Sequence, residues 1–464
     1  MTGSAAAQES APELAERALG LALPGAVQVS VVRERALTSR FARSAPTQAT
    51  AVEDTDVEFL VVRDGHAALA STNRLDDETL RDTARRADAA ARAAARSGAG
   101  SHPGLLELGE PGAADLAAVD GFDAATALLD PQQAGAALGD VFAVAADHGL
   151  EAFGIWTAGA VRTAIASSTG VRRDEEVTDA FMKVLCRDAD GRSGFASATA
   201  MAATAIDAQA VARAAAAKVD GAPLAELAPG AYPVVLEPAA VGALLEFLGD
   251  LAFNGRSHAE GRGALAGRLG TAVAAPAIDL ADDPSSPATL PHGFDLEGVR
   301  KAPLTLLEGG VARAVAHDRR SAALAGDRAG STGHAPRPAG SPWGPVPTNL
   351  VLGGGDAADT AALAAPIERG IYVTRLWYVN TVREKETLLT GMTRDGTFLI
   401  EDGAITRPLR DVRFTDSVLR LLAATEALTR ESQLVSDGEL YGRRFAHGTV
   451  CPALRAGGFR VTGG

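Results

Sequence analysis

Residues 232–255 read YPVVLEPAAVGALLEFLGDLAFNG, a pattern that predicts a buried strand leading directly into an amphipathic helix. The strand core is the apolar run VVL at 234–236, and Pro238 suits a first helical turn, where a missing N–H costs nothing. Apolar side chains then recur at helical spacing and form one stripe that faces the core: Val241, Leu244, Leu245, Leu248 and Leu251. Glu246 and Asp250 lie four residues apart on the other side, as expected for a solvated helix face.

The bulk composition predicts a globular protein with a large core, because 47% of the 464 residues are hydrophobic and 22% are charged. The net charge of -14 and the pI near 5.1 argue against nucleic acid or an anionic membrane as a partner. No apolar run is long enough to span a membrane, and residues 1–26 lack a signal-peptide core, so we expect a cytoplasmic protein. Cys186 and Cys451 are far apart and lack metal-ligand spacing, which indicates reduced thiols.

The first half of the chain predicts a mixture of helices and strands. Helices are expected at 13–23, 76–96, 131–148 and 207–219, and strands at 26–32, 153–168 and within 180–203. Residues 33–56 are polar and weakly periodic, whereas 57–63 and 66–71 flank Asp64-Gly65 and predict a hairpin. Pro and Gly at both ends of 221–230 predict a boundary between an amino-terminal α/β domain, residues 1–220, and a strand-rich domain, residues 231–464. The predicted fold class is therefore α+β with two domains.

The second half is dominated by strands and by turns that contain glycine. A hairpin is predicted at 303–307 and 311–316, a strong strand at 371–382, and a helix at 416–430. Residues 392–409 predict a meander with turns at Asp395-Gly396 and Asp402-Gly403. Residues 318–355 form a long segment rich in Gly, Pro and Ser, and loops of this length are usually functional or disordered.

Three of these stretches closely resemble the TldD/PmbA metallopeptidase family: residues 232–255, the IYVT run at 371–374, and GTFLIEDGAITRPLRDVRFTDSVLRLL at 396–422. In the metal-bearing branch of that family the helix carries His-Glu-x-x-x-His, in which two imidazoles hold zinc and the glutamate polarises water. When Leu244-Leu245 is set on the leucine pair before that motif, the three motif positions are occupied by Glu246, Phe247 and Leu251. The resemblance thus implies the PmbA (TldE)-like side of the family, which lacks its own metal site.

The carboxyl-terminal stretch also resembles the family, and it too lacks the metal ligand found in the zinc-bearing branch. The zinc-bearing branch contributes a cysteine ligand shortly before a Leu-Pro pair, and the matching stretch here is RRFAHGTVCPALRAGGFRV at 443–461. With Cys451-Pro452 set on that pair, Arg443 occupies the ligand position. The resemblance then implies no catalytic residue and no metal in this chain. It implies instead a zinc-bearing TldD-like partner subunit, with unfolded or leader peptides as the substrate of the complex.

Two other functions remain open from the sequence. One is an active metallopeptidase with an atypical site formed by Glu246, Asp250 and His258, with Glu260 nearby, although no two histidines are spaced as a helix-borne zinc pair. The other is a homo-oligomeric peptide-binding protein without catalysis. For contacts with a partner or a peptide, the sequence favours segment 318–355 and four side chains of strand 371–382: Arg375, Trp377, Tyr378 and Asn380.

Overall fold

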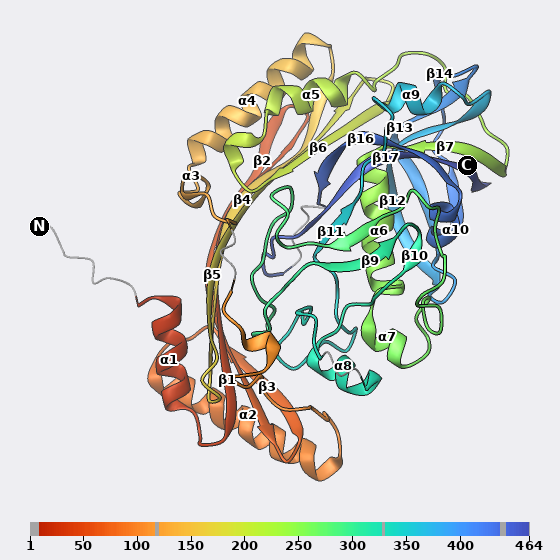
Figure 1. The fold of residues 1–464 in the computed structure, drawn as a ribbon. Helices are drawn as coiled ribbons and strands as arrows, with labels where there is room; N and C mark the ends of the chain where they lie inside the picture. The colour runs from red at the N-terminus through yellow and green to blue at the C-terminus, as the bar shows by residue number, and fades with distance from the viewer. Residues whose placement is uncertain (1–8, 117–119, 327–329, 437–441, 464) are drawn as a thin grey trace, which may run out of the picture.

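The computed structural model describes residues 9–116, 120–326, 330–436 and 442–463, and these form two sheets that face each other (Figure 1). The amino-terminal sheet is antiparallel, with strand order β3-β2-β1-β4-β5-β6. Its strands are β1 (Ala26–Ala42), β2 (Ala45–Arg63), β3 (His66–Thr72), β4 (Glu151–Ser167), β5 (Arg172–Arg187) and β6 (Ser193–Ala200). The mixed α+β fold class predicted from the sequence is confirmed.

Two pairs of helices cover different ends of the long strands (Figure 1). The helices are α1 (Ala11–Leu21), α2 (Asp77–Ser97), α4 (Pro131–Asp147) and α5 (Ala208–Ala216), with the short α3 (Ala124–Ala127) between the pairs. Helices α1 and α2 pack on β1 and β2 around Phe59, and α4 and α5 pack on β4 and β5 around Trp156. Val32, Val161 and Val177 belong instead to a cluster with Leu290, so the opposite face of the sheet packs against the second half of the chain.

The carboxyl-terminal sheet has eleven strands in the described residues, and its last strand lies near its centre. Strand β17 (Gly448–Gly463) pairs with four others, β7, β11, β15 and β16. The other strands are β7 (Gly230–Leu236), β8 (Leu280–Asp282), β9 (Leu304–Glu308), β10 (Val311–Ala312), β11 (Asn349–Leu352), β12 (Arg369–Arg383), β13 (Leu388–Glu401), β14 (Ala404–Pro408), β15 (Arg413–Ser417) and β16 (Thr425–Val435). The predicted domain boundary at 221–230 lies between the two sheets in the sequence.

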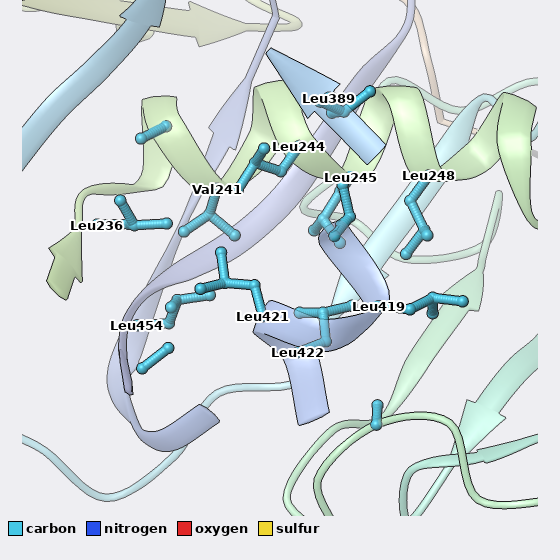
Figure 2. Close-up of a cluster of buried hydrophobic side chains, with 14 of the residues drawn as sticks. Leu236, Val241, Leu244, Leu245, Leu248, Leu389, Leu419, Leu421, Leu422 and Leu454 are labelled. Atoms are coloured by element: carbon cyan, nitrogen blue, oxygen red, sulfur yellow. The ribbon is translucent and has the colours of Figure 1, made fainter. Parts of the chain in front are cut away.

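Helix α6 (Pro238–Leu251) follows β7 directly and lies on this sheet, as the strand-to-helix pattern predicts. Its apolar stripe packs on leucines from β13, α10 (Val418–Ala423) and β17 (Figure 2). The remaining helices are the short α7 (Gly255–Ala259), α8 (Arg319–Ala325) and α9 (Thr360–Ala364). In the described part of the chain, no helix combines the length and the apolar character that crossing a membrane requires.

Three local predictions are wrong. The strands predicted at 26–32 and 57–63 are too short, because β1 and β2 continue through residues 33–56 as one long ladder, in which the β2 side is exposed and carries no apolar alternation. Asp395-Gly396 is not a turn but lies inside β13, where both residues have positive φ and the register with β12 shifts, which marks a bulge. The helix predicted at 416–430 ends at Ala423, since the following residues pair with β17 as β16.

Candidate functional site

A cavity of about 740 Å³ lies between the two sheets, beside helix α6. Helix α6 contributes Glu246, Phe247 and Asp250 to its wall, and β12 contributes Arg375 with the two residues Trp377 and Tyr378. The opposite wall comes from the amino-terminal sheet and includes Phe181, Lys183 and Phe195. The sequence singles out helix α6 and the aromatic strand β12 separately. In the structure both line the same cavity, which is apolar and partly charged.

The four positions matched to the family's metal site, three ligands and the catalytic glutamate, do not converge. Glu246 and Phe247 face the cavity, but Leu251 is buried in the core, where it packs with the rest of the apolar stripe. Arg443 precedes β17 and forms an ion pair with Asp56 of β2 at 2.7 Å. Among the described residues, no three His, Cys, Asp or Glu side chains are grouped so that they could hold a metal ion.

The carboxylates and the histidine of the atypical-metal alternative have other neighbours. Asp250 accepts a hydrogen bond from Asn254 at 3.2 Å, and burial raises the pKa of Asp250 above its usual value. Glu260 lies on the surface between Arg256 and Arg262, at 2.9 and 2.7 Å, and these arginines lower the pKa of Glu260. Burial lowers the pKa of His258 on α7, whose Nδ1 is buried without a hydrogen-bond partner in the described structure.

Arg375 is engaged within the chain. Its guanidinium donates to Asp395 at 2.8 Å, and Asp395 also accepts a hydrogen bond from Ser193 of β6 at 2.5 Å. The same guanidinium lies over the rings of Phe195 and Trp377, with 4.6 and 5.0 Å to the ring centroids. Arg375 therefore ties the two sheets together across the cavity. The bulge that gives Asp395 its position had no signal in the sequence beyond the Asp-Gly pair.

Trp377, Tyr378 and Asn380 present a different arrangement. The Trp377 side chain is 37% exposed and lies between Arg375 and Arg394. Tyr378 has a φ of 53° within an irregular part of the β12–β13 ladder and is 77% exposed. Asn380 stabilises this irregular part of the ladder by donating a hydrogen bond from Nδ2 to the Tyr378 carbonyl at 2.9 Å. Trp377 and Tyr378 form an aromatic edge on the cavity wall, and none of the three residues belongs to the core.

Residues 443–446, hereafter the RRFA segment, dock on the amino-terminal sheet. The Arg444 side chain is fully buried and donates to both Asp179 carboxylate oxygens, at 2.6 and 2.7 Å, and to Thr157 at 3.0 Å. Gly159 is required beside it, because a Cβ there would come within 2.4 Å of the guanidinium. Phe445 stacks on His292 with 4.8 Å between ring centroids. The sequence alone indicates none of these contacts.

His292 completes this contact between the sheets. Its Nδ1 lies 2.9 Å from Glu175 of β5, and its Nε2 lies 2.6 Å from the Ala446 carbonyl. Burial by itself lowers the pKa of His292, but the hydrogen bond and the charge of Glu175 raise it above its ordinary value. The imidazole thus favours its protonated form, in which both ring nitrogens donate.

Comparison with known proteins gives consistent matches across the chain. The model of the PmbA/TldA metallopeptidase C-terminal domain matches residues 229–463, which is half of the chain, and the model of PmbA/TldA metallopeptidase domain 1 matches residues 27–91. A curated relative from Methanothermobacter thermautotrophicus, named a metalloprotease, is 27% identical over 208 residues. That match spans 44% of this chain and 44% of the relative, less than half the length of either.

Solved structures match over nearly the full chain. TldE from Thermococcus kodakarensis superposes with a TM-score of 0.82 at 18% identity, covering 97% of this chain and 99% of that one. A candidate modulator of a DNA gyrase from Thermotoga maritima gives a TM-score of 0.78 at 20% identity, covering 94% and 96% of the two chains. A similar protein from Bacteroides thetaiotaomicron gives 0.77 at 18% identity, with 98% of each covered. At these identities the likeness concerns the fold.

Proposed function

Because the chain belongs to the PmbA/TldA metallopeptidase family, also called TldD/PmbA, we propose that it is the non-metal, TldE-like subunit of a heteromeric zinc peptidase. In this proposal a TldD-like partner subunit binds the zinc and cleaves unfolded or leader peptides in the cytoplasm. This chain completes the enclosure around the peptide and supports the fold of the partner. It contributes neither a catalytic residue nor a metal ligand.

The observation that carries the proposal is the chemistry of the α6 wall. The cavity beside α6 is present and large, yet the residues there are a carboxylate, a phenyl ring and a second carboxylate: Glu246, Phe247 and Asp250. Zinc sites in peptidases use imidazole, thiolate and carboxylate ligands in a converging set, and no such set occurs in the described residues. The position of the family's cysteine ligand holds an arginine paired with Asp56, and a cation there repels zinc.

The atypical-metal alternative has weaker support. Its acid Glu260 already binds two arginines, and burial favours the protonated form of Asp250, whereas a metal ligand must be deprotonated. The homo-oligomeric alternative predicts that the aromatic edge at Trp377 and Tyr378 contacts a second copy of the chain. It differs from the main proposal only in the identity of the partner.

Metal analysis and reconstitution together test the proposal. The purified chain, dialysed without chelator and measured by elemental analysis, should hold far less than one zinc per chain. Mixing it with a zinc-bearing relative from the same genome should give a stable complex, and peptidase activity should require both chains. One zinc per isolated chain would exclude the non-metal role. A zinc-free chain that forms only homo-oligomers, with no effect on the relative's activity, would favour the binding-protein alternative.

A further inference from the structure

A second cavity of about 450 Å³ lies between the amino-terminal sheet and the loops before β17, and of the four positions matched to the family's metal site only Arg443 lines it. One wall is apolar and comes from the sheet: Val32, Val161 and Val177. Val161 and Val177 are direct neighbours in the β4–β5 register, so this wall is continuous. Phe294 and Val346 face it from the carboxyl-terminal half. The volume lies in the range of small-molecule sites, roughly 300–1,000 Å³.

One guanidinium of the cavity forms no ion pair in the part of the chain that the structure describes, although its charge acts on Glu58. Arg337 lines the cavity, is exposed, and has no ion pair or hydrogen bond from its side chain within the described residues. The other ammonium and guanidinium groups of the cavity are paired: Lys301 with Asp282 at 3.2 Å, Arg443 with Asp56 at 2.7 Å, and Arg444 with Asp179 at 2.6 Å. Arg337 is therefore available to an anionic group of a ligand.

A carboxylate in the same cavity is also without a partner. Glu58 of β2 is half-buried, and across the described chain it makes no ion pair and its side chain no hydrogen bond. Burial raises the pKa of Glu58, and the neighbouring charge of Asp56 raises it further, while Arg443 and Arg337 lower it. A partly desolvated carboxylate is stabilised when a cation binds to it. Within the described structure, the cavity thus offers one carboxylate, that of Glu58, to a cationic group of a ligand and one guanidinium, that of Arg337, to an anionic group.

We propose that this second cavity binds a short apolar peptide with both termini free, its α-ammonium at Glu58 and its α-carboxylate at Arg337. The valine wall then covers the side chains of the peptide, and the charged groups recognise what every free peptide shares, its two termini. A nucleotide fits less well, because a phosphate would meet a single free guanidinium and be repelled by Glu58. The site is a property of this chain alone. It extends the proposed function, since a peptidase complex releases peptides of this kind.

Isothermal titration of the isolated chain with leucyl-leucine tests the site without the partner subunit. Wild-type chain should bind the dipeptide, and Glu58→Gln or Arg337→Gln should each weaken binding about tenfold or more, as expected for loss of a charge-assisted hydrogen bond. Glu78→Gln and Arg96→Gln, on exposed positions of α2, remove the same charges outside the cavity and should leave the affinity unchanged. Thermal melts establish that each variant is folded.

Blocked dipeptides assign each terminus to its residue. N-acetyl-leucyl-leucine lacks the ammonium, so Glu58→Gln should not weaken its binding further, whereas Arg337→Gln should. Leucyl-leucine amide lacks the carboxylate and should show the reverse dependence. Absence of dipeptide binding by the folded wild-type chain would overturn the proposal, and so would wild-type affinity in both cavity variants. Either result leaves complex formation with a zinc-bearing relative untouched, so the two proposals fail separately.

Discussion

Replacing Arg444 by alanine should destabilise the chain more than any other single change in the RRFA segment. The arginine is 0% exposed, and its guanidinium makes two bonds to the Asp179 carboxylate and one to Thr157. Truncation leaves Asp179 without its cation in a site where only 12% of its own side chain is exposed. Breaking a buried pair in this way costs about 3–5 kcal/mol, compared with a total stability of roughly 5–15 kcal/mol for a typical domain.

The measurement is urea unfolding, followed by tryptophan fluorescence, because Trp156 is buried next to Thr157. The matched control is Arg443→Ala, whose ion pair with Asp56 is 40% exposed on the arginine side and should contribute about 1 kcal/mol or less. Replacing both members of the buried pair, Arg444→Met with Asp179→Leu, should cost less than the sum of the single changes. Equal loss of stability in Arg444→Ala and Arg443→Ala would refute the assignment of Arg444 as the most stabilising residue of the RRFA segment.

Three further predictions concern the cavity and the contact between the sheets. Trp377→Ala should leave the melting temperature of the isolated chain nearly unchanged but weaken binding to a zinc-bearing partner by about 2 kcal/mol, roughly thirtyfold, in a sedimentation titration; a large drop in melting temperature would make it a core residue. Glu246→Ala or Asp250→Ala should leave the peptidase activity of the reconstituted complex intact, and its collapse with the fold preserved would favour the atypical metal site. Because the pKa of His292 is raised in the folded chain, its pairing with Glu175 stabilises fully below about pH 6.5 and fades as the pH rises through the raised value. Urea unfolding between pH 6 and 9 should show this slope in the parent and lose it in Glu175→Gln; identical slopes would contradict it.

Local periodicity predicted the parts of the fold that depend on nearby residues. The β7–α6 unit follows from an apolar triplet and a helical stripe, and the hairpin at Asp64-Gly65 follows from turn chemistry. Strand β16 was missed because its Ala, Leu and Glu content favours a helix, and only pairing with β17 makes it a strand. The outer part of β2 was missed because an exposed strand carries no apolar alternation, and that of β1 because polar residues such as Glu34 and Ser39 occupy buried positions.

Residues of the candidate site could be predicted from the sequence only where they lie together on a single helix or strand. Helix α6 and the aromatic strand could be named from sequence, since each is a single continuous segment. The pairing of Arg375 with Asp395 depends on a bulge, and that of Arg444 with Asp179 joins residues 265 positions apart. Nothing in the types of these residues distinguishes them from other charged groups on strands and loops. The same holds for the unpaired charges of Glu58 and Arg337, which become a pair of ligand contacts only once the chain has folded.

The central position of β17 has a consequence for how the protein is made. The chain emerges from the ribosome amino terminus first, so the sixteen residues of β17 become available only after all their pairing partners have been synthesised. Until then β7, β11, β15 and β16 lack the strand that joins them. The amino-terminal sheet, whose strands end at Ala200, has no such delay. Until β17 is synthesised, the nascent carboxyl-terminal half therefore has unpaired strand edges, which can pair with other chains and aggregate. A stop codon before Gly448 would make that state permanent.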